Sequence, residues 1–313
     1  MQVVERLSSL PDANRPFHLA VGVFDGVHLG HREVFASAKN AAATHGGSPV
    51  IVTFDPHPAQ VLRPEAAPPL LMTAEQKLRR ITALGFPQIL VLPFDQRLRQ
   101  KSAREFWNDL AGEERLVGSI SVGTDWRFGQ DRQGDITLLK EMGKTEGFHA
   151  FGVPALEWEG KTISSSGIRR FIAEGNFQEA EHRLGHPFLM AGVVSEGKRL
   201  GRTLGFPTAN LLVKGKALPP YGVYVVQAQL ASRSESWSGI ANLGLRPTLE
   251  ETQEPKLEVY LFDYEGPAFY GDELQVRFLE FLRPEQPFPG IEALKTQIET
   301  DVGMAKSFWA TRK

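Results

Sequence analysis

The sequence contains no cysteine among its 313 residues. This absence excludes disulfide bonds, thiolate metal sites and cysteine nucleophiles, and it is compatible with a reducing compartment. The sequence also has no apolar run near the roughly 18 residues that a membrane-spanning helix requires. Residues 1–16 lack the charged and then apolar pattern of a signal peptide. We therefore expect a cytoplasmic protein without a membrane partner.

The sequence also lacks a large excess of positive or negative charge. Lysine and arginine total 35 against 37 aspartates and glutamates, which gives a formal net charge of −2. Nucleic acids and anionic membranes attract strongly basic surfaces, so neither is expected as a partner. Anionic small substrates must then be held by local groups of charges and backbone N–H groups. The sequence leaves the oligomeric state open, and we expect a monomer or a weak homo-oligomer.

The length exceeds that of one ordinary domain and suits two. Up to about residue 184, short apolar runs alternate with helical patterns. The expected strands cover 17–24, 49–54, 88–92 and 118–123, and the expected helices cover about 30–45, 73–84 and 102–111. Thr73 begins one of these helices with a capping box. This alternation predicts an α/β domain over residues 1–184, with a Rossmann-like parallel sheet covered on both faces.

The pattern changes after residues 185–187. The segments 221–230, 256–262 and 273–281 are rich in β-branched and aromatic residues that alternate with period two. They predict an antiparallel sheet or small β-barrel over residues 185–313. A terminal helix from about residue 290 carries an apolar stripe at three- and four-residue spacing, made of Ile291, Leu294, Ile298 and Val302.

The strongest local signal is a glycine-rich segment where the first strand meets the first helix. Residues 22–31 read GVFDGVHLGH. Glycines such as Gly22 and Gly30 let the backbone approach a triphosphate, and the start of a helix offers free N–H groups. In open α/β sheets, ligands bind at this kind of junction.

Two histidines in this segment are candidate catalytic residues. His28 and His31 are three residues apart, so they share one face of the first helical turn. Two imidazoles there can donate hydrogen bonds to phosphate oxygens as negative charge moves to a departing pyrophosphate. The alternative is that both are incidental surface histidines, but the pairing and the glycines favour catalysis. The pattern indicates a nucleotidyltransferase without identifying its substrate.

Three further segments follow in order. They read TFDPHP at 53–58, VGTDWRFG at 122–129 and ISSSGIR at 163–169. With residues 22–31, they make this half of the chain resemble the bacterial bifunctional riboflavin kinase/FAD synthetases. Three positions depart from the usual family residues, namely Val23, Trp126 and Ser166, where Asn, Phe and Thr are usual.

The resemblance implies a binding role for each segment. The first and last would bind ATP phosphates through Gly22, Phe24, Asp25, Gly30, Ser164, Ser165, Ser166 and Arg169. The middle two would shape an FMN site through Phe54, His57, Pro58, Asp125 and Phe128. Hydroxyls at a helix start, followed by an arginine, suit a phosphate clamp, and aromatic rings suit an isoalloxazine. The alternatives are a helix cap for the serines, a turn for the aspartate and core positions for the two phenylalanines.

The second half carries a segment suited to a nucleotide. Residues 201–211 read GRTLGFPTANL. Gly201 permits close approach and Arg202 can pair with phosphate, while the Thr208 hydroxyl and Asn210 amide oxygen are hard ligands for Mg²⁺. A Gly/Pro turn between strands is the alternative. The segment resembles the signature of riboflavin kinases, which implies that it binds Mg·ATP.

More of the second half matches the same family, at 221–224, 239–248, 257–263, 270–271 and 282–284. Strand alternation places Glu258, Tyr260 and Phe262 on one face. The resemblance implies that Glu258 is the general base that takes the proton of the ribityl 5′-hydroxyl. The alternative is a solvated acid on an outward-facing strand position. Tyr260 replaces a histidine that is frequent in the family.

The resemblance extends over about residues 15–310. It implies an enzyme that phosphorylates riboflavin to FMN in the second domain and adenylylates FMN to FAD in the first, with ATP and Mg²⁺. Two alternatives remain: a nucleotidyltransferase for another substrate, such as phosphopantetheine or a pyridine mononucleotide, and a flavin-sensing barrel without turnover. The PTAN-containing second half disfavours the former. Intact Thr208, Asn210 and Glu258 disfavour the latter.

Overall fold

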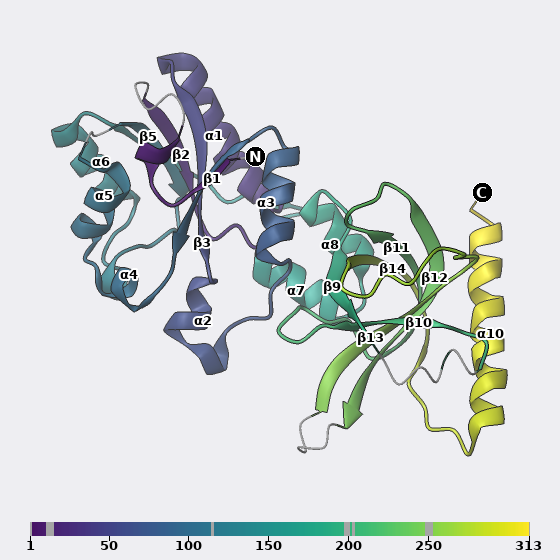
Figure 1. The fold of residues 1–313 in the computed structure, drawn as a ribbon. Coiled ribbons are helices and arrows are strands. Elements are labelled where there is room, and N and C mark those ends of the chain that lie inside the picture. Colours follow the sequence, from purple (N-terminus) through teal and green to yellow (C-terminus); the bar gives the residue numbers. More distant parts are fainter. Residues whose placement is uncertain are drawn as a thin grey trace. The chain divides into compact units, whose positions relative to one another are not determined.

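Two separately packed units make up the chain, Met1–Ser165 and Ser166–Lys313 (Figure 1). The structure is a computed structural model. It describes residues 2–10, 16–113, 116–196, 201, 204–247 and 253–312.

The first unit is built on a six-stranded parallel sheet in the order β1-β4-β3-β2-β5-β6. Its strands are β1 (Gln2–Val4), β2 (Phe17–Val21), β3 (Ser48–Asp55), β4 (Gln88–Pro93), β5 (Val117–Gly123) and β6 (His149–Val153). The predicted parallel sheet is confirmed. The sequence pattern does not reveal the edge strands β1 and β6, because neither contains a fully buried residue.

β2 ends at Val21, short of the predicted end at Phe24. Phe24 has a left-handed backbone, with φ of 54°, and cannot continue a strand. Its buried ring packs edge-on against the rings of His31 and Phe35. The strand stops early because the chain must turn the glycine-rich segment toward the first helix.

Helices cover both faces of the sheet, as predicted. The longer ones are α1 (Leu29–His45), α3 (Ala74–Ala83), α5 (Ala103–Ala111) and α6 (Ile136–Glu146). Shorter helices are α2 (Pro58–Leu62) and α4 (Gln96–Gln100). Val50 and Val52 of β3 join the core with α5 and α6, whereas Ile51 joins the core with α1 and α3. Figure 1 shows α5 and α6 on one side of the strands and α3 on the other. The predicted capping box of Thr73 is present at the start of α3.

The second unit contains a closed barrel of six antiparallel strands in the order β10-β13-β12-β11-β14-β9. The strands are β9 (Leu189–Ser195), β10 (Thr208–Leu212), β11 (Gly222–Leu230), β12 (Ser236–Pro247), β13 (Gln253–Leu261) and β14 (Glu273–Pro284). Alternate apolar side chains such as Leu211, Leu257 and Val259 fill the interior and have no exposed surface. The predicted small barrel is confirmed. Its packed interior leaves the outer surface as the place for a ligand.

Two helices precede the barrel strands, α7 (Ser165–Ala173), of which only the first residue belongs to the first unit, and α8 (Phe177–Leu184). Phe177 of α8 stacks on Phe278 of β14, with ring centroids 5.5 Å apart. Glu181 of α8 accepts a hydrogen bond of 2.9 Å from Arg277 Nε on the same strand. α8 is therefore fastened to the barrel by both an apolar and a charged contact.

The predicted terminal helix is confirmed as α10 (Ile291–Ala310). Val302 and Ala305 pack it against Val225 and Ile240 on the outer face of the barrel. Ile291, predicted as the start of the apolar stripe, is instead 55% exposed because it lies at the free end of the helix. In the described part of the chain, no helix has both the length and the apolar character needed to cross a membrane.

A buried histidine joins β2 to β5 at the amino-terminal side of the parallel sheet. His18 Nε2 lies 2.9 Å from the Gly46 carbonyl oxygen and Nδ1 lies 2.8 Å from Ser119 Oγ. A carbonyl only accepts, so Nε2 carries the proton and Nδ1 accepts from the serine hydroxyl. Burial, with a smaller effect from the imidazoles of His45 and His149, lowers the pKa of His18 below its ordinary value of 6.5; the bond to Gly46 opposes this shift.

Lowering the pH should therefore destabilise the first unit. The unfolded chain protonates His18 more readily than the folded one, so the free energy of unfolding falls as pH decreases below 6.5. Denaturant unfolding between about pH 7.5 and 5.5 measures this fall. His18→Gln keeps amide hydrogen-bonding groups but cannot titrate, so its pH dependence should be weaker. Some dependence persists, because the pKa of His31 is lowered too. Identical pH profiles for both proteins would contradict the assignment.

Candidate active sites

The glycine-rich segment forms a tight loop between β2 and α1. Phe24 and Val27 have left-handed φ values of 54° and 42°. A Cβ atom at Gly22 would lie 2.6 Å from the Phe24 ring, so a side chain there would force the loop apart. The compact loop places the segment directly before the amino-terminal end of α1, where free N–H groups can hold a phosphate.

His28 caps helix α1. Its Nδ1 accepts a hydrogen bond of 3.2 Å from the backbone N–H of His31. Since Nδ1 accepts, the proton of the neutral imidazole lies on Nε2. The rings of His28 and His31 stack with centroids 3.5 Å apart, which confirms that the two histidines share one face. The cap therefore sets a tautomer in which Nε2–H is a hydrogen-bond donor.

His31 is held neutral and lacks one partner. Burial, the His28 imidazole and the Lys77 ammonium together lower the pKa of His31 well below 6.5. Its Nδ1 is shielded from solvent and makes no hydrogen bond within the described residues. A buried polar atom without a partner is costly, so a ligand that bonds to it would recover that energy.

Asp25 connects three parts of the first unit. Its buried carboxylate accepts hydrogen bonds of 3.1 and 3.2 Å from the backbone N–H of Leu71. Its carbonyl oxygen accepts a bond of 2.9 Å from Ser165 Oγ. Gly30 also faces this region, since a Cβ atom there would lie 3.7 Å from the Ile163 carbonyl oxygen. The structure thus brings together the two segments predicted to bind ATP phosphates.

The serine cluster lies at a helix start, as predicted. Ser164 immediately precedes α7, which begins at Ser165. Ser166 and Arg169 follow within α7 and belong to the second unit. Their roles in ATP binding stay predictions.

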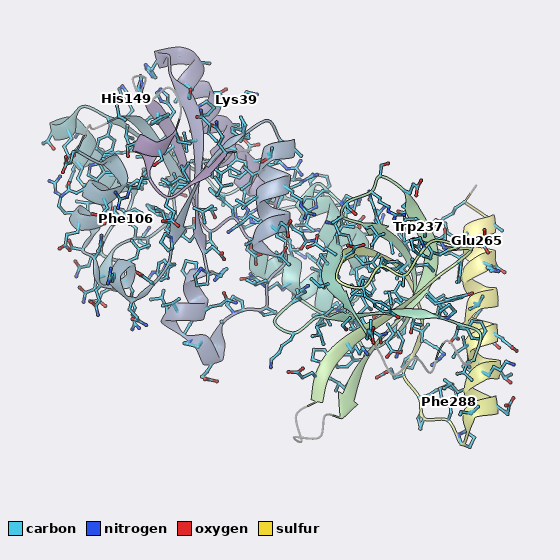
Figure 2. All side chains as sticks on the ribbon, in the orientation of Figure 1. Lys39, Phe106, His149, Trp237, Glu265 and Phe288 are labelled. Atoms are coloured by element: carbon cyan, nitrogen blue, oxygen red, sulfur yellow. The ribbon has the colours of Figure 1, made fainter. Side chains whose placement is uncertain are left out.

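The two phenylalanines predicted for the FMN site belong to an aromatic cluster. Phe54 is 5% exposed and Phe128 is 6% exposed. Phe106 of α5, labelled in Figure 2, packs against both rings, with centroids 6.4 and 5.6 Å away. Phe128 also stacks on Trp126 at 4.8 Å, and Trp126 is only partly buried. In this cluster Trp126 offers a ligand more free surface than either phenylalanine.

The other predicted FMN residues lie at the carboxyl ends of neighbouring elements. His57 caps α2, its Nδ1 accepting a bond of 3.1 Å from the Ala59 N–H, and Pro58 is the first residue of that helix. Asp125 is exposed just after β5. β3 and β5 flank β2 in the sheet, so both segments emerge beside the glycine-rich loop. Their contact with FMN stays a prediction.

A pocket of about 200 Å³ opens on the outer face of the barrel, beside the first half of α10. Its wall is a row of residues paired across neighbouring strands, Asn210, Glu258, Asn242, Val223 and Arg283. Paired residues in adjacent strands project to the same side of a sheet. Leu294 and Ile298 of α10 form the opposite wall. One row of the barrel thus presents polar groups to a partly apolar pocket.

Glu258 lies in the middle of this row. Its side chain is 25% exposed, and its carboxylate lies 3.6 Å from Lys256 Nζ on the same face of β13. Tyr260 also lines the pocket and Phe262 packs under α10, so the predicted common face of these residues is confirmed. The carboxylate is therefore oriented toward a pocket rather than toward bulk solvent.

The two residues predicted to bind Mg²⁺ lie beside this carboxylate. Thr208 and Asn210 both line the pocket, and Asn210 Nδ2 donates a bond of 3.3 Å to the Thr208 carbonyl oxygen. Hydroxyl, amide and carboxylate oxygens are the donors that Mg²⁺ prefers, so these residues fit the ion. Within the described residues, no cluster of three or more His, Cys, Asp or Glu side chains could hold a metal ion. Gly201 also lines the pocket, whereas Arg202 lies outside the described residues.

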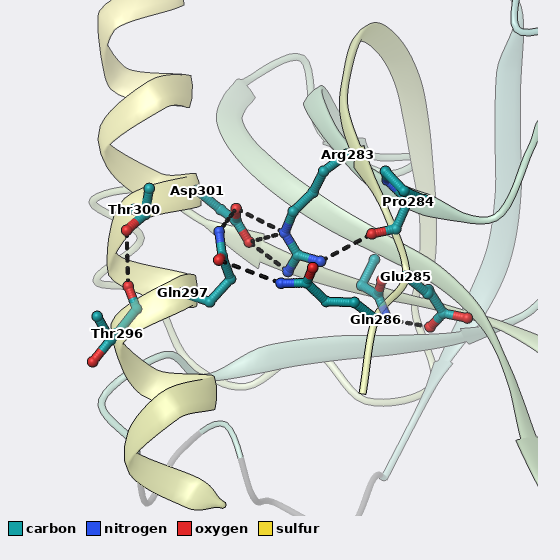
Figure 3. A network of polar contacts seen from close by, with 9 residues as sticks. Arg283, Pro284, Glu285, Gln286, Thr296, Gln297, Thr300 and Asp301 are labelled. Carbon is teal, nitrogen blue, oxygen red and sulfur yellow. Dashed lines mark hydrogen bonds and ion pairs between the residues drawn. The ribbon is translucent and has the colours of Figure 1, made fainter. Parts of the chain in front are cut away.

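A polar network closes the end of the pocket and joins it to α10 (Figure 3). Asp301, which is almost fully buried, accepts hydrogen bonds of 3.0 and 2.8 Å from Arg283 Nε and Nη2. Gln297 Nε2 donates a further bond of 2.9 Å to the same carboxylate. Phe288, beside the start of α10 in Figure 2, lies under the guanidinium at 5.6 Å. The hydrogen bonds with Asp301 hold the Arg283 guanidinium in a fixed orientation at the pocket wall.

Sequence reasoning assigned no role to Asn242 or Arg283. Both stand in segments that match the riboflavin kinase pattern, and only the strand register reveals that they share a row with Glu258. Asn242 Nδ2 donates a bond of 3.1 Å to Glu285 Oε1, which links β12 to the loop after β14. The sequence feature that could have identified them is the presence of an amide and a guanidinium within segments that match the family, residues 239–248 and 282–284.

Two family models match successive parts of the chain. The FAD synthetase family model matches residues 10–167 and the riboflavin kinase family model matches residues 184–309. The bifunctional riboflavin kinase/FMN adenylyltransferase of Pseudomonas fluorescens is 38% identical over 99% of this chain and 98% of its own. The protein of the same description from Escherichia coli K12 is 35% identical over 94% and 93%.

A solved structure shares the fold over nearly the entire chain. It is described as a macrolide-efflux protein from Streptococcus pneumoniae and superposes with a TM-score of 0.80. The two sequences are 28% identical, and the match covers 97% of this chain and 98% of that one. With both family models matching in sequence order, the chain belongs to the bifunctional riboflavin kinase/FMN adenylyltransferase family.

Proposed function

We propose that the chain catalyses two consecutive reactions with ATP: riboflavin is phosphorylated to FMN at the barrel pocket, and FMN is adenylylated to FAD at the parallel-sheet unit. The observation that carries the proposal is the polar row on the pocket wall. There, Asn210 pairs across the strands with Glu258, so a nucleotide-binding signature and a candidate base meet. The order of the two family models supports the same assignment.

Our proposal puts the functional boundary between residues 184 and 185. The riboflavin kinase family model begins at residue 184, in support of this position. α7 and α8 then belong to the adenylyltransferase part by sequence, although α8 is fastened to the barrel. A cytoplasmic location and a monomeric or weakly oligomeric state stay predictions.

In the kinase reaction, Glu258 accepts the proton of the ribityl 5′-hydroxyl as that oxygen bonds to the γ-phosphorus of ATP. The bond from the γ-phosphorus to the bridging oxygen breaks, and ADP leaves. Thr208 and Asn210 would hold Mg²⁺ with the ATP phosphates, where the ion neutralises charge on the phosphate oxygens. The nearby Lys256 ammonium orients the Glu258 carboxylate. Leu294 and Ile298 supply apolar surface suited to a flavin ring.

In the adenylyltransferase reaction, an oxygen of the FMN phosphate attacks the α-phosphorus of ATP and pyrophosphate leaves. His28 donates from Nε2 to the phosphate oxygens, because its Nδ1 is engaged in capping α1. His31 adds a second neutral imidazole, and the amino-terminal end of α1 adds its partial positive charge. Fixed donors aimed at developing charge are the main catalytic contribution expected here.

Incubation of the purified protein with riboflavin, ATP and Mg²⁺, followed by chromatography, tests both reactions.

His28→Ala should reduce FAD formation from FMN by about 10²–10³-fold, since it removes one donor to developing charge. Riboflavin phosphorylation should stay at its normal rate on the same preparation. His28→Asn is the matched control for structure, because asparagine can also cap a helix through its side-chain oxygen. It should restore stability without restoring FAD formation. If both variants form FAD within a few-fold of the normal rate, His28 is only a helix cap.

Glu258→Gln should reduce FMN formation by roughly 10²–10⁴-fold, because glutamine keeps the size of the side chain but cannot accept the proton. Supplied with FMN, the same variant should form FAD normally. Glu280→Gln, which removes an exposed carboxylate from β14, is the matched control and should leave both activities intact. Loss of neither activity in Glu258→Gln would show that the carboxylate is not a base, and loss of both would indicate misfolding.

A further inference from the structure

Lys77 is a buried cation in the first unit. It lies inside α3 with only 8% of its surface exposed. A lysine is rarely buried to this extent, because its ammonium must be fully compensated inside a protein. Here Nζ donates to the Phe54 carbonyl oxygen at 3.0 Å, to Thr53 Oγ1 at 3.0 Å and to the Val23 carbonyl oxygen at 3.3 Å. All three N–H groups of the ammonium are thus engaged.

The three acceptors lie on two neighbouring segments of the adenylyltransferase site. The β2–β3 ladder ends where Val21 pairs with Val52, apart from one bond from the Gly22 N–H to the Val52 carbonyl oxygen. Beyond that point the ladder no longer links the two backbones. Lys77 and Thr53 take its place, since Thr53 Oγ1 also donates to the Val23 carbonyl oxygen at 3.0 Å. The ammonium therefore joins the segments just where they separate to form the site.

Each joined segment leads directly to predicted site residues. Val23 precedes the left-handed Phe24, and the same loop continues to His28 at the start of α1. Phe54 precedes the turn that leads to His57 and α2. Movement of either carbonyl would shift the residues that follow it. Positions in an active site are sensitive to such shifts, and displacement by about 1 Å can cost about 10²-fold in rate.

Titratable groups face Lys77 from the surrounding elements. Asp25 lies in the loop after β2, Asp55 ends β3, and the neutral His31 lies in the first turn of α1. Burial lowers the pKa of Lys77 to about 8, while the Asp25 and Asp55 carboxylates act in the opposite direction. The ammonium in turn contributes to the lowered pKa of His31.

Solvent can reach this ammonium. A pocket of about 430 Å³ lies over the carboxyl ends of β1, β4 and β3, and Lys77 lines it together with Thr53, Asp55 and Glu5. Lys77 can therefore exchange its proton with water.

We propose that Lys77 is a positioning residue for FMN adenylylation, whose ammonium holds the loop after β2 and the end of β3 in register. This inference rests on the proposed function of the first unit. Lys77 acts through the residues that it positions, and no contact with substrate is assigned to it. A neutral amine has two N–H donors for three acceptors, so loss of the proton weakens the link between the segments.

Lys77→Met tests this role in the full-length protein. FAD formation from FMN and ATP should fall by about 10²-fold, chiefly through kcat, because the variant removes the ammonium but keeps much of the side-chain volume. Riboflavin phosphorylation in the same preparation should be unchanged. Arg79→Met is the matched control, since it removes a more exposed positive charge from the same helix. It should form FAD at the normal rate.

The pH profile separates positioning from a merely structural role. FAD formation by the unaltered protein should decline as pH rises through about 8, where the ammonium loses its proton. Riboflavin phosphorylation should show no such decline. Thr53→Val removes one acceptor without changing charge, so the ammonium is less favoured and the decline should move to lower pH. An arginine at position 77 keeps its positive charge as pH rises through about 8. Any FAD formation by Lys77→Arg should therefore not fall with rising pH.

The possible outcomes are distinct. FAD formation by Lys77→Met within about threefold of normal, with the normal pH profile, would overturn the inference. If that variant does not fold, the comparison of Thr53→Val with the unaltered protein decides, and coincident declines in the two proteins would overturn it. If the unaltered protein forms no FAD at all, the proposed function fails, and this result is recognisable before any variant is made.

Discussion

Both units depend on the two-residue period of the β-strand, which sends neighbouring side chains to opposite faces. In β13, Leu257 and Val259 fill the barrel while Glu258 faces the pocket. In β3, Val52 and Phe54 enter one core, whereas Thr53 points to the other face and meets Lys77. A shift of one residue in either register would bury the carboxylate or expose the core. The strand pairings therefore fix the positions of Glu258 and Thr53 as well as the fold.

The two sites manage charge in different ways. At the start of α1, burial keeps His31 neutral, so it can serve as a donor or acceptor without attracting a counterion. At the barrel, charges are paired: Glu258 with Lys256, and Arg283 with Asp301. A buried pair is costly to form, but it fixes orientation once its hydrogen bonds are complete. Arg283 is such a case, because its guanidinium bonds to Asp301 and to the Pro284 carbonyl oxygen.

Much of this architecture can be predicted from local patterns. Strand alternation predicts the antiparallel sheet or barrel and the face that carries Glu258, and three-residue spacing predicts that His28 and His31 share a face. Features that depend on distant partners cannot be read in this way. Lys77 looks like an ordinary polar residue of an amphipathic helix, because its acceptors lie on β3 and the loop after β2. Likewise, aromatic residues suit a core as well as a ligand, and only the packing shows that Phe54 and Phe128 are buried.

The pocket of the second unit lies outside the barrel rather than within it, and α10 forms its far wall. The side chains that fill the barrel interior therefore differ from those that line the pocket. Substitutions at outward positions such as Asn242 and Tyr260 leave the interior packing around Leu257 in place. A library of variants substituted only in this outer row and in the facing turns of α10 could be screened for binding of flavin analogues. The buried residues that stabilise the barrel would be unchanged in all of them.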